Sequence, residues 1–245
     1  MLTTSMNDGD LQERKTPTPP AIGTAVQDYL KIIYKLRDED GLVSPSLVAE
    51  RLGVSPAAVT KMTKRLAEMN LVRSGRNQRL GLTPSGEKIA LEIVRHHRLL
   101  ELYLKEALGY SWDQVDAEAE RLEHAISEEF EERIDQMLGH PTRDPHGDPI
   151  PTKEGTILEE THERLTTLEP GQSGVVRRVR DTDPEMLRYM ASLGLYPDAS
   201  VEMLDKAPYG GPLRVRIGEM EHAIGRELAD SVFVARATAD HGKGP

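Results

Sequence analysis

Two Ser-Pro pairs constrain what this chain can fold into, because each pair marks the start of a helix. Ser44-Pro45 and Ser55-Pro56 each offer an N-cap hydroxyl followed by a proline at the first helical position. Gly53 lies between them and ends the first of the two helices. Two short helices joined by a tight glycine turn predict a helix-turn-helix.

The surrounding residues extend this motif into a domain covering residues 23–83. A helical period predicts a preceding helix from Thr24 to Gly41, with Thr24 and Gln27 as a capping box. Two short strands at 71–73 and 80–82 flank a turn and form a wing. We therefore expect a winged helix-turn-helix, preceded by a disordered tail at residues 1–22.

The rest of the chain changes from helical to strand-like patterns. Thr83-Pro84 opens a long helix, and an acidic helix from Ser111 to about Gly139 completes a helical domain at 84–152. We expect a linker helix at 153–168 and a strand-rich module at 169–237, with one helix at 183–193. A disordered tail at 238–245 follows. The predicted fold class is mainly α, ending in a small β-barrel.

Charge is distributed unevenly, although the net charge is −10. Residues 55–80 carry six Lys and Arg against Glu68 alone, whereas residues 106–135 carry eleven acids against two arginines. A basic and an acidic patch on one chain indicate two kinds of partner, an anion for the first and cations for the second.

The second helix of the helix-turn-helix carries the basic surface. Small residues at its start allow close approach to a major groove, where Ser55, Thr60 and Lys61 can read bases. A basic face can also be only a solvated surface, but the wing favours double-stranded DNA as the partner. The candidate DNA-binding residues are Ser55, Pro56, Ala57, Thr60, Lys61, Lys64, Arg65, Arg76 and Arg79.

Carboxylates and one imidazole gather on one side of the acidic helix, in a sector about 100° wide at 100° per residue. Like charges crowded in this way repel each other unless a cation neutralises them. Their oxygen and imidazole ligands suit Mn(II), Fe(II), Co(II) or Zn(II), and their hardness favours Mn(II). A solvated acidic face is the alternative. The candidate ligands, from three helices, are Asp28, His97, Glu101, Asp116, Glu120, Glu123 and His124.

Composition excludes several other classes. The chain has no cysteine, so disulfides, thiolate zinc sites, iron–sulfur clusters and a cysteine nucleophile are excluded. No apolar run approaches the roughly 20 residues of a membrane helix, and the N-terminus does not read as a signal peptide. We expect a cytoplasmic protein without a membrane partner.

Several motifs in order resemble the diphtheria-toxin-repressor and manganese-transport-regulator family (DtxR/MntR) of metal-dependent repressors. The matching segments are Asp28-Tyr29-Leu30 with Ile33-Tyr34, Val59–Met62, Leu82–Gly86, His97–Glu101, Glu120–His124 and His146–Pro151. The region after Glu169 looks like the SH3-like (FeoA-type) module of the longer members. The resemblance covers almost the whole chain beyond its N-terminal tail.

The resemblance implies a homodimer that binds operator DNA when metal is present and represses genes of metal homeostasis. By position, the main regulatory site is formed by Asp28, Glu120, Glu123 and His124. A neighbouring site is formed by His97 and Glu101, with Asp116 where some members have histidine. The iron-responsive branch has sulfur ligands at the positions of Asp28 and Glu120, whereas the manganese branch has carboxylates, as here. The expected cofactor is Mn(II), with Fe(II) second.

Three positions need separate comment in the comparison with that family. Lys31 stands where a manganese-branch member can place another glutamate, which argues against a closely bridged pair of metals. Long members complete the second site with two side chains from the SH3-like module, and Asp183 and Glu185 are the nearest candidates here.

Two other functions fit part of the pattern. A metal-dependent hydrolase could use His97, Glu101, Glu120 and His124 as an open site, but no nucleophile with its orienting partner is evident. A metal-independent winged-helix repressor could use the acidic helix only as a dimer surface. We expect no catalysis and no small-molecule substrate.

Overall fold

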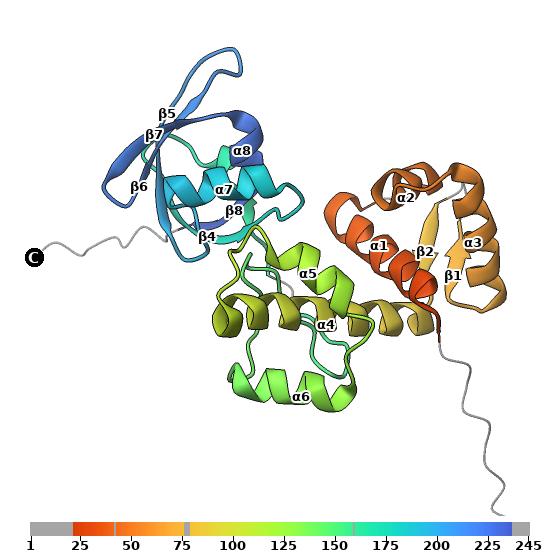
Figure 1. The fold of residues 1–245 in the computed structure, drawn as a ribbon. Coiled ribbons are helices and arrows are strands. Elements are labelled where there is room, and N and C mark those ends of the chain that lie inside the picture. Colours follow the sequence, from red (N-terminus) through yellow and green to blue (C-terminus); the bar gives the residue numbers. More distant parts are fainter. Residues whose placement is uncertain (1–21, 42, 76–78, 159, 237–245) are drawn as a thin grey trace, which may run out of the picture.

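The computed structural model describes residues 22–41, 43–75, 79–158 and 160–236, which fold into three bodies grouped around one long helix (Figure 1). The tails predicted at 1–22 and 238–245 lie outside these residues, apart from Ile22. Each body has its own cluster of buried apolar side chains. The described residues therefore form three separate hydrophobic cores.

The N-terminal body is the predicted winged helix-turn-helix. It comprises α1 (Thr24–Asp40), α2 (Pro45–Leu52), α3 (Pro56–Glu68), β1 (Val72–Ser74) and β2 (Leu80–Leu82). The Ser44 and Ser55 hydroxyls accept hydrogen bonds from the backbone N–H groups of Leu47 and Ala58, so both predicted N-caps are present. The two strands pair antiparallel and form the wing.

The helical body is formed by α4 (Pro84–Leu108), α5 (Val115–Leu122) and α6 (Glu128–Met137). Helix α4 runs through the centre of the molecule, with α1 packed against it on one side and α5 and α6 on others (Figure 1). Because α4 contacts α1, α5 and α6, it sets the position of α1 relative to the acidic helices.

The C-terminal body is a six-stranded antiparallel sheet in the order β3-β8-β4-β5-β6-β7. Its strands are β3 (Glu163–Arg164), β4 (Ser173–Val179), β5 (Ser200–Lys206), β6 (Leu213–Ile217), β7 (Met220–Ile224) and β8 (Val232–Arg236). The short helices are η2 (Leu165–Thr167), α7 (Pro184–Leu193) and α8 (Arg226–Asp230). Trp112, from the loop between α4 and α5, is buried in this core and fastens the sheet to the helical body.

Three local predictions were wrong. The acidic helix is two helices, because the Ser127 hydroxyl caps a new start at α6. No helix forms over residues 153–158, where Gly155 has a φ of +77°, and residues 163–164 pair with β8 instead. Gly23 is the N-cap of α1, and Thr24 and Gln27 form no capping box. "Mainly α" therefore describes the first two bodies, not the third.

Within the described part of the chain, no helix is both long and apolar enough to cross a membrane.

Candidate metal centre

The first group of candidate ligands lies where α1 meets the end of α5, and we call it the α1–α5 cluster. It consists of Asp28, Glu120, Glu123 and His124. His124 Nε2 lies 2.7 Å from Asp28 Oδ1 and 3.3 Å from Glu123 Oε1. Residues almost a hundred positions apart in sequence thus meet in one cluster that joins two bodies.

A glutamine orients the histidine of this cluster. Gln27 Oε1 lies 2.9 Å from His124 Nδ1, which leaves Nε2 directed at Asp28 and Glu123. A histidine that ligates metal usually donates its other ring N–H to an oxygen in this way. Sequence analysis assigned Gln27 to a helix cap, because the capping pattern does not reveal long-range contacts.

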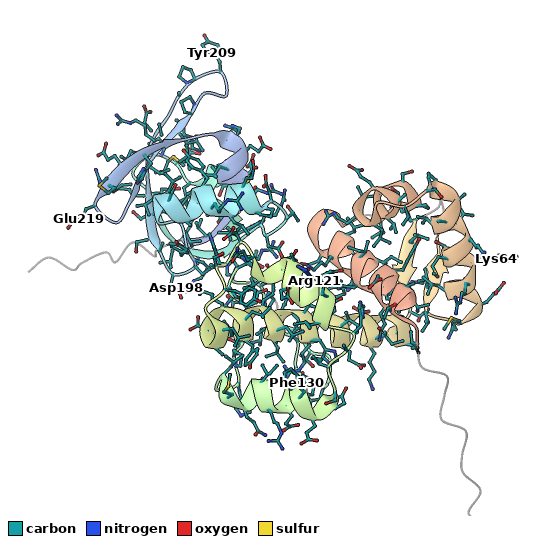
Figure 2. The ribbon with its side chains drawn as sticks, viewed as in Figure 1. Lys64, Arg121, Phe130, Asp198, Tyr209 and Glu219 are labelled. Atoms are coloured by element: carbon teal, nitrogen blue, oxygen red, sulfur yellow. The ribbon has the colours of Figure 1, made fainter. Side chains whose placement is uncertain are left out.

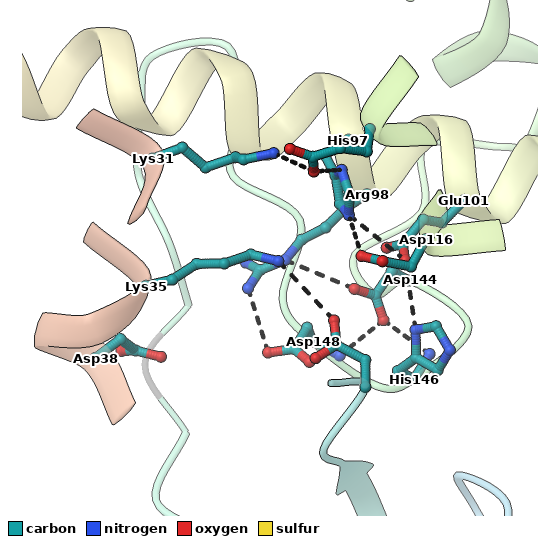
Figure 3. Close-up of polar contacts among 12 residues, drawn as sticks. Lys31, Lys35, Asp38, His97, Arg98, Glu101, Asp116, Asp144, His146 and Asp148 are labelled. Carbon is teal, nitrogen blue, oxygen red and sulfur yellow. Dashed lines mark hydrogen bonds and ion pairs between the residues drawn. The ribbon is translucent and has the colours of Figure 1, made fainter. Parts of the chain in front are cut away.

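The second group lies along the middle of α4, and we call it the α4 cluster. It consists of His97, Glu101, Asp116, Asp144 and His146. His97 Nε2 is 3.2 Å from Asp116 Oδ1 and 3.6 Å from Glu101 Oε1, and His146 Nδ1 is 3.6 Å from the same Glu101 oxygen (Figure 3). His97 Nδ1 also lies 2.6 Å from Glu123 Oε2, so the two clusters touch.

Buried polar atoms in both clusters lack hydrogen-bond partners among the described residues. They include both carboxylate oxygens of Glu101, Nε2 of His97, Nδ1 of His146 and Oδ1 of Asp28. Glu101 has no exposed surface, and such atoms are rarely left unsatisfied in a folded core. Several of these atoms point at one another, so the donor set fits a divalent cation bound by oxygen and imidazole.

The pKa values of two buried acids near the α4 cluster, Asp144 and Asp181, are shifted in opposite directions. Burial and the neighbouring Asp148 and Glu101 raise the pKa of Asp144 to about 8. Burial also disfavours ionised Asp181, but the charges of Lys35, His146 and His97 outweigh it and lower its pKa to about 2. At Asp144, burial and acidic neighbours therefore outweigh the nearby Arg98 and His146, whereas at Asp181 the positive neighbours outweigh burial.

His97 is the most strongly perturbed base of the clusters. Burial alone disfavours its imidazolium form, but the charge of Glu101 and the adjacent Asp116 carboxylate outweigh burial. The pKa of His97 therefore lies well above its ordinary value. The same acidic neighbours that favour a charged His97 ring would also favour a bound cation.

The C-terminal body contributes one acid to this region, Asp181. Its Oδ2 lies 3.9 Å from Lys35 Nζ, and its charge acts on His97 and His146. The structure does not bring Asp183 or Glu185 into either cluster. Asp183 caps α7 by accepting hydrogen bonds from the backbone of Glu185 and Met186. The structure thus places Asp181, and neither of the two predicted residues, beside the α4 cluster.

Sequence reasoning also missed Asp144 and His146. Both lie in the loop before Pro149, whose carbonyl accepts a hydrogen bond from Arg98 of α4. The sequence places His146 in the matching segment His146–Pro151 but not among the candidate ligands. That motif was the available signal, because the clustering itself depends on the path of the loop.

The candidate DNA-binding residues of α3 lie on one exposed side of the N-terminal body. Figure 2 shows Lys64 pointing outward, away from the other two bodies. Lys61, Lys64 and Arg65 have no ion-pair partner in the part of the chain that the structure describes, which leaves their charge available. Arg76 lies outside the described residues. The exposed candidates are Ser55, Pro56, Ala57, Thr60, Lys61, Lys64, Arg65 and Arg79.

Comparison with known proteins gives three family matches in chain order. Residues 21–78 match the N-terminal DNA-binding domain of iron-dependent repressors, and residues 83–152 match their metal-binding and dimerisation domain. Residues 163–236 match the FeoA domain. Together these matches span nearly all of the described residues.

Individual relatives agree. The iron-dependent repressor IdeR of Mycobacterium leprae is 31% identical over 220 residues, covering 85% of this chain and 95% of that protein. The diphtheria toxin repressor of Corynebacterium efficiens is 29% identical over 219 residues, covering 83% and 95%. These relatives are repressors rather than enzymes, so the hydrolase alternative finds no support among them.

Solved structures give the same answer. A manganese-dependent transcriptional repressor in complex with manganese has a TM-score of 0.81 and 40% identity, covering 86% of this chain and 100% of that one. The manganese regulator SloR has a TM-score of 0.71 and 32% identity, covering 86% and 98%. The chain thus belongs to the iron-dependent repressor family, whose members are metal-dependent transcriptional repressors.

Proposed function

We propose that this protein is a repressor that binds operator DNA as a homodimer in response to Mn(II), with Fe(II) as the second candidate, and acts in the cytoplasm. The observation that supports this most is the α1–α5 cluster, where Asp28 of the helix-turn-helix body meets Glu123 and His124 at the end of α5. Its donors are oxygen and imidazole, and the chain has no cysteine thiolate that would favour softer metals.

One metal ion would be held by the four residues of the α1–α5 cluster, Asp28, Glu120, Glu123 and His124. A second ion would be held by the α4 cluster, which consists of His97, Glu101, Asp116, Asp144 and His146. When bound, a divalent cation supplies positive charge that these ligands share. Asp28 belongs to α1, which packs against α2 within the same hydrophobic core as α3. Fixing α1 against α5 therefore also fixes the orientation of α3.

The dimer would form through the helical body. Several large apolar side chains at the end of α4 and on α6 are exposed in the single chain, and pairing of two chains would cover them. They are Leu108, Tyr110, Phe130 and Met137. Pairing two chains through this surface would place two α3 helices for two half-sites of DNA.

The test combines calorimetry with DNA selection. The purified protein is titrated with Mn(II), Fe(II) and Zn(II), and the metal-loaded protein then selects sequences from a random duplex library. We expect metal binding and enrichment of one two-fold symmetric sequence, lost on addition of a chelator. Enrichment that is equal with and without chelator would instead support the metal-independent repressor.

A further inference from the structure

Helix α1 directs two lysines, one turn apart, at the two candidate clusters (Figure 3). Lys31 Nζ lies 2.6 Å from Glu120 Oε2 and 2.5 Å from Glu123 Oε1, and only 2% of the Lys31 side chain is exposed. Lys35 Nζ lies 3.9 Å from Asp181 Oδ2, beside the α4 cluster. These ion pairs join the N-terminal body to the other two without any metal.

The atoms that Lys31 contacts are the ones a metal would need. Glu123 Oε1, which faces Lys31, also faces His124 Nε2 at 3.3 Å. The other Glu123 oxygen is already engaged by His97. Since Glu123 is fully buried, it has no alternative oxygen free to offer a cation while both contacts persist.

The free-energy cost of burying several carboxylates explains why the Lys31 ammonium lies beside the α1–α5 cluster. Asp28, Glu120 and Glu123 put three carboxylates into one partly buried cluster, and such groups repel one another unless a positive charge is nearby. A buried ammonium is itself costly unless it is paired, and here it has two partners. Lys31 thus supplies part of the charge that a bound cation would otherwise supply.

We propose that Lys31 is a tethered counter-ion that competes with divalent metal for Glu120 and Glu123, and so sets the metal concentration at which the protein responds. This inference rests on the proposed function. Metal uptake is then an exchange of one cation for another, and the displaced ammonium must leave both carboxylates. Lys35 balances Asp181 in the same manner at the α4 cluster.

A purely structural salt bridge makes a different prediction. If Lys31 only holds α1 in place, removing its charge lowers the stability of the protein and leaves its metal affinity unchanged or lower. If Lys31 competes with metal, removing its charge destabilises the metal-free protein but tightens metal binding. The two roles therefore differ in the sign of the change in metal affinity.

The test uses Lys31→Met in the full chain, with Arg37→Met as the matched control. Arg37 is also a cation of α1 and pairs with Glu87 of α4, outside both clusters. Mn(II) affinity is measured by calorimetry, and the melting temperature is measured with and without Mn(II). Should Lys31→Met not fold, Lys31→Gln removes the charge but keeps a hydrogen-bond donor.

We expect Lys31→Met to bind Mn(II) about tenfold more tightly, since a neighbouring charge changes the proton affinity of a carboxylate by a comparable factor. Its melting temperature should fall without metal and rise further than that of the wild type on addition of Mn(II). Arg37→Met should keep the wild-type affinity. Unchanged or weaker binding by the Lys31 variants overturns the inference while leaving the proposed function intact.

Two remaining outcomes are also decisive. Mn(II) binding by Lys31→Met but not by the wild type supports the competition. Absence of binding by both proteins overturns the proposed function, and the inference with it.

Discussion

Glu120 is the most accessible carboxylate of the α1–α5 cluster, with about half of its side chain exposed, and it contacts both Lys31 and His97. An exposed ligand position can be exchanged without disturbing a core. It is therefore the best place to test which metals the cluster prefers.

We predict that Glu120→Cys changes the order of metal preference. A thiolate is a soft ligand, so Zn(II) and Fe(II) should gain affinity relative to Mn(II). Calorimetric titration with each metal measures the order, and Glu118→Cys is the control, because Glu118 lies on the same helix but pairs with Arg121. An unchanged order in Glu120→Cys would mean that Glu120 does not bind the metal.

Residue by residue, the sequence supports those ligands that helical spacing places on one face. The structure brings together all seven ligands predicted from the helices, which are Asp28, His97, Glu101, Asp116, Glu120, Glu123 and His124. Asp181 could not be chosen by spacing, because it follows a strand and its position depends on how the third body docks. Asp183-Pro184 is an N-cap pattern, and this pattern already indicates that the Asp183 carboxylate is engaged by backbone N–H groups.

At the scale of single elements, helix starts marked by Ser-Pro, Thr-Pro or Asp-Pro were predicted accurately, because the caps are local. The break between α5 and α6 was missed for a physical reason. Leu122, Ile126 and Phe130 continue the helical period across the break, so periodicity gave no sign of it. Phe130 is 42% exposed in this single chain, so it continues the period without being buried.

Helix α3 carries an electrostatic prediction. Lys64→Ala should weaken binding to specific and random DNA alike and reduce the slope of log affinity against log salt by about one, because one fewer phosphate is neutralised. Fluorescence anisotropy at several salt concentrations measures both quantities. Lys105→Ala, at the far end of α4, should change neither; an unchanged slope in Lys64→Ala would reject α3 as the DNA-contacting helix.

The loop that carries Asp144 and His146 packs closely against β4 at Gly147. Gly147 has a φ of +91°, and a Cβ at this position would lie 2.0 Å from the carbonyl oxygen of Arg177. Only a residue without a side chain therefore fits there. The close approach holds the loop in place, and the backbone carbonyl of His146 accepts a hydrogen bond from the Val179 N–H.

Gly147→Ala should therefore lower the free energy of unfolding by more than the about 1–3 kcal/mol expected from the backbone conformation alone. Gly139→Ala is the matched control, because Gly139 has a φ of +74° and no atom near its missing Cβ. Urea unfolding compares the two variants. Equal losses would show that the loop does not depend on its contact with β4.

At the scale of the whole molecule, α1 is the element on which all three bodies meet. It contacts α4 directly, reaches α5 through Asp28 and Lys31, and reaches the C-terminal body through Lys35 and through Asp38, which lies 3.7 Å from Arg178. A shift of α1 must therefore be transmitted to the other helices of its own body, since they share one core. The sequence predicted the winged helix, the helical domain and the strand-rich domain but not this arrangement, which arises from contacts between distant segments.

Metal and DNA should therefore affect each other's binding. If metal favours the arrangement of α3 that fits DNA, DNA must tighten metal binding by the same factor. Typical couplings of about 1–3 kcal/mol correspond to roughly 5–150-fold in affinity. Asp28 is the residue to change, because its loss leaves the other three candidate ligands of the α1–α5 cluster and the exposed cations of α3 in place.

The most direct measurement compares Mn(II)-stimulated binding of the selected operator by the wild type and by Asp28→Ala. We predict that Asp28→Ala remains a folded dimer, keeps part of its Mn(II) affinity and loses most of the stimulation that the wild type shows. Anisotropy with and without Mn(II) gives the stimulation, and light scattering checks the dimer. Full stimulation of Asp28→Ala by Mn(II) would contradict the proposed link between α1 and α5.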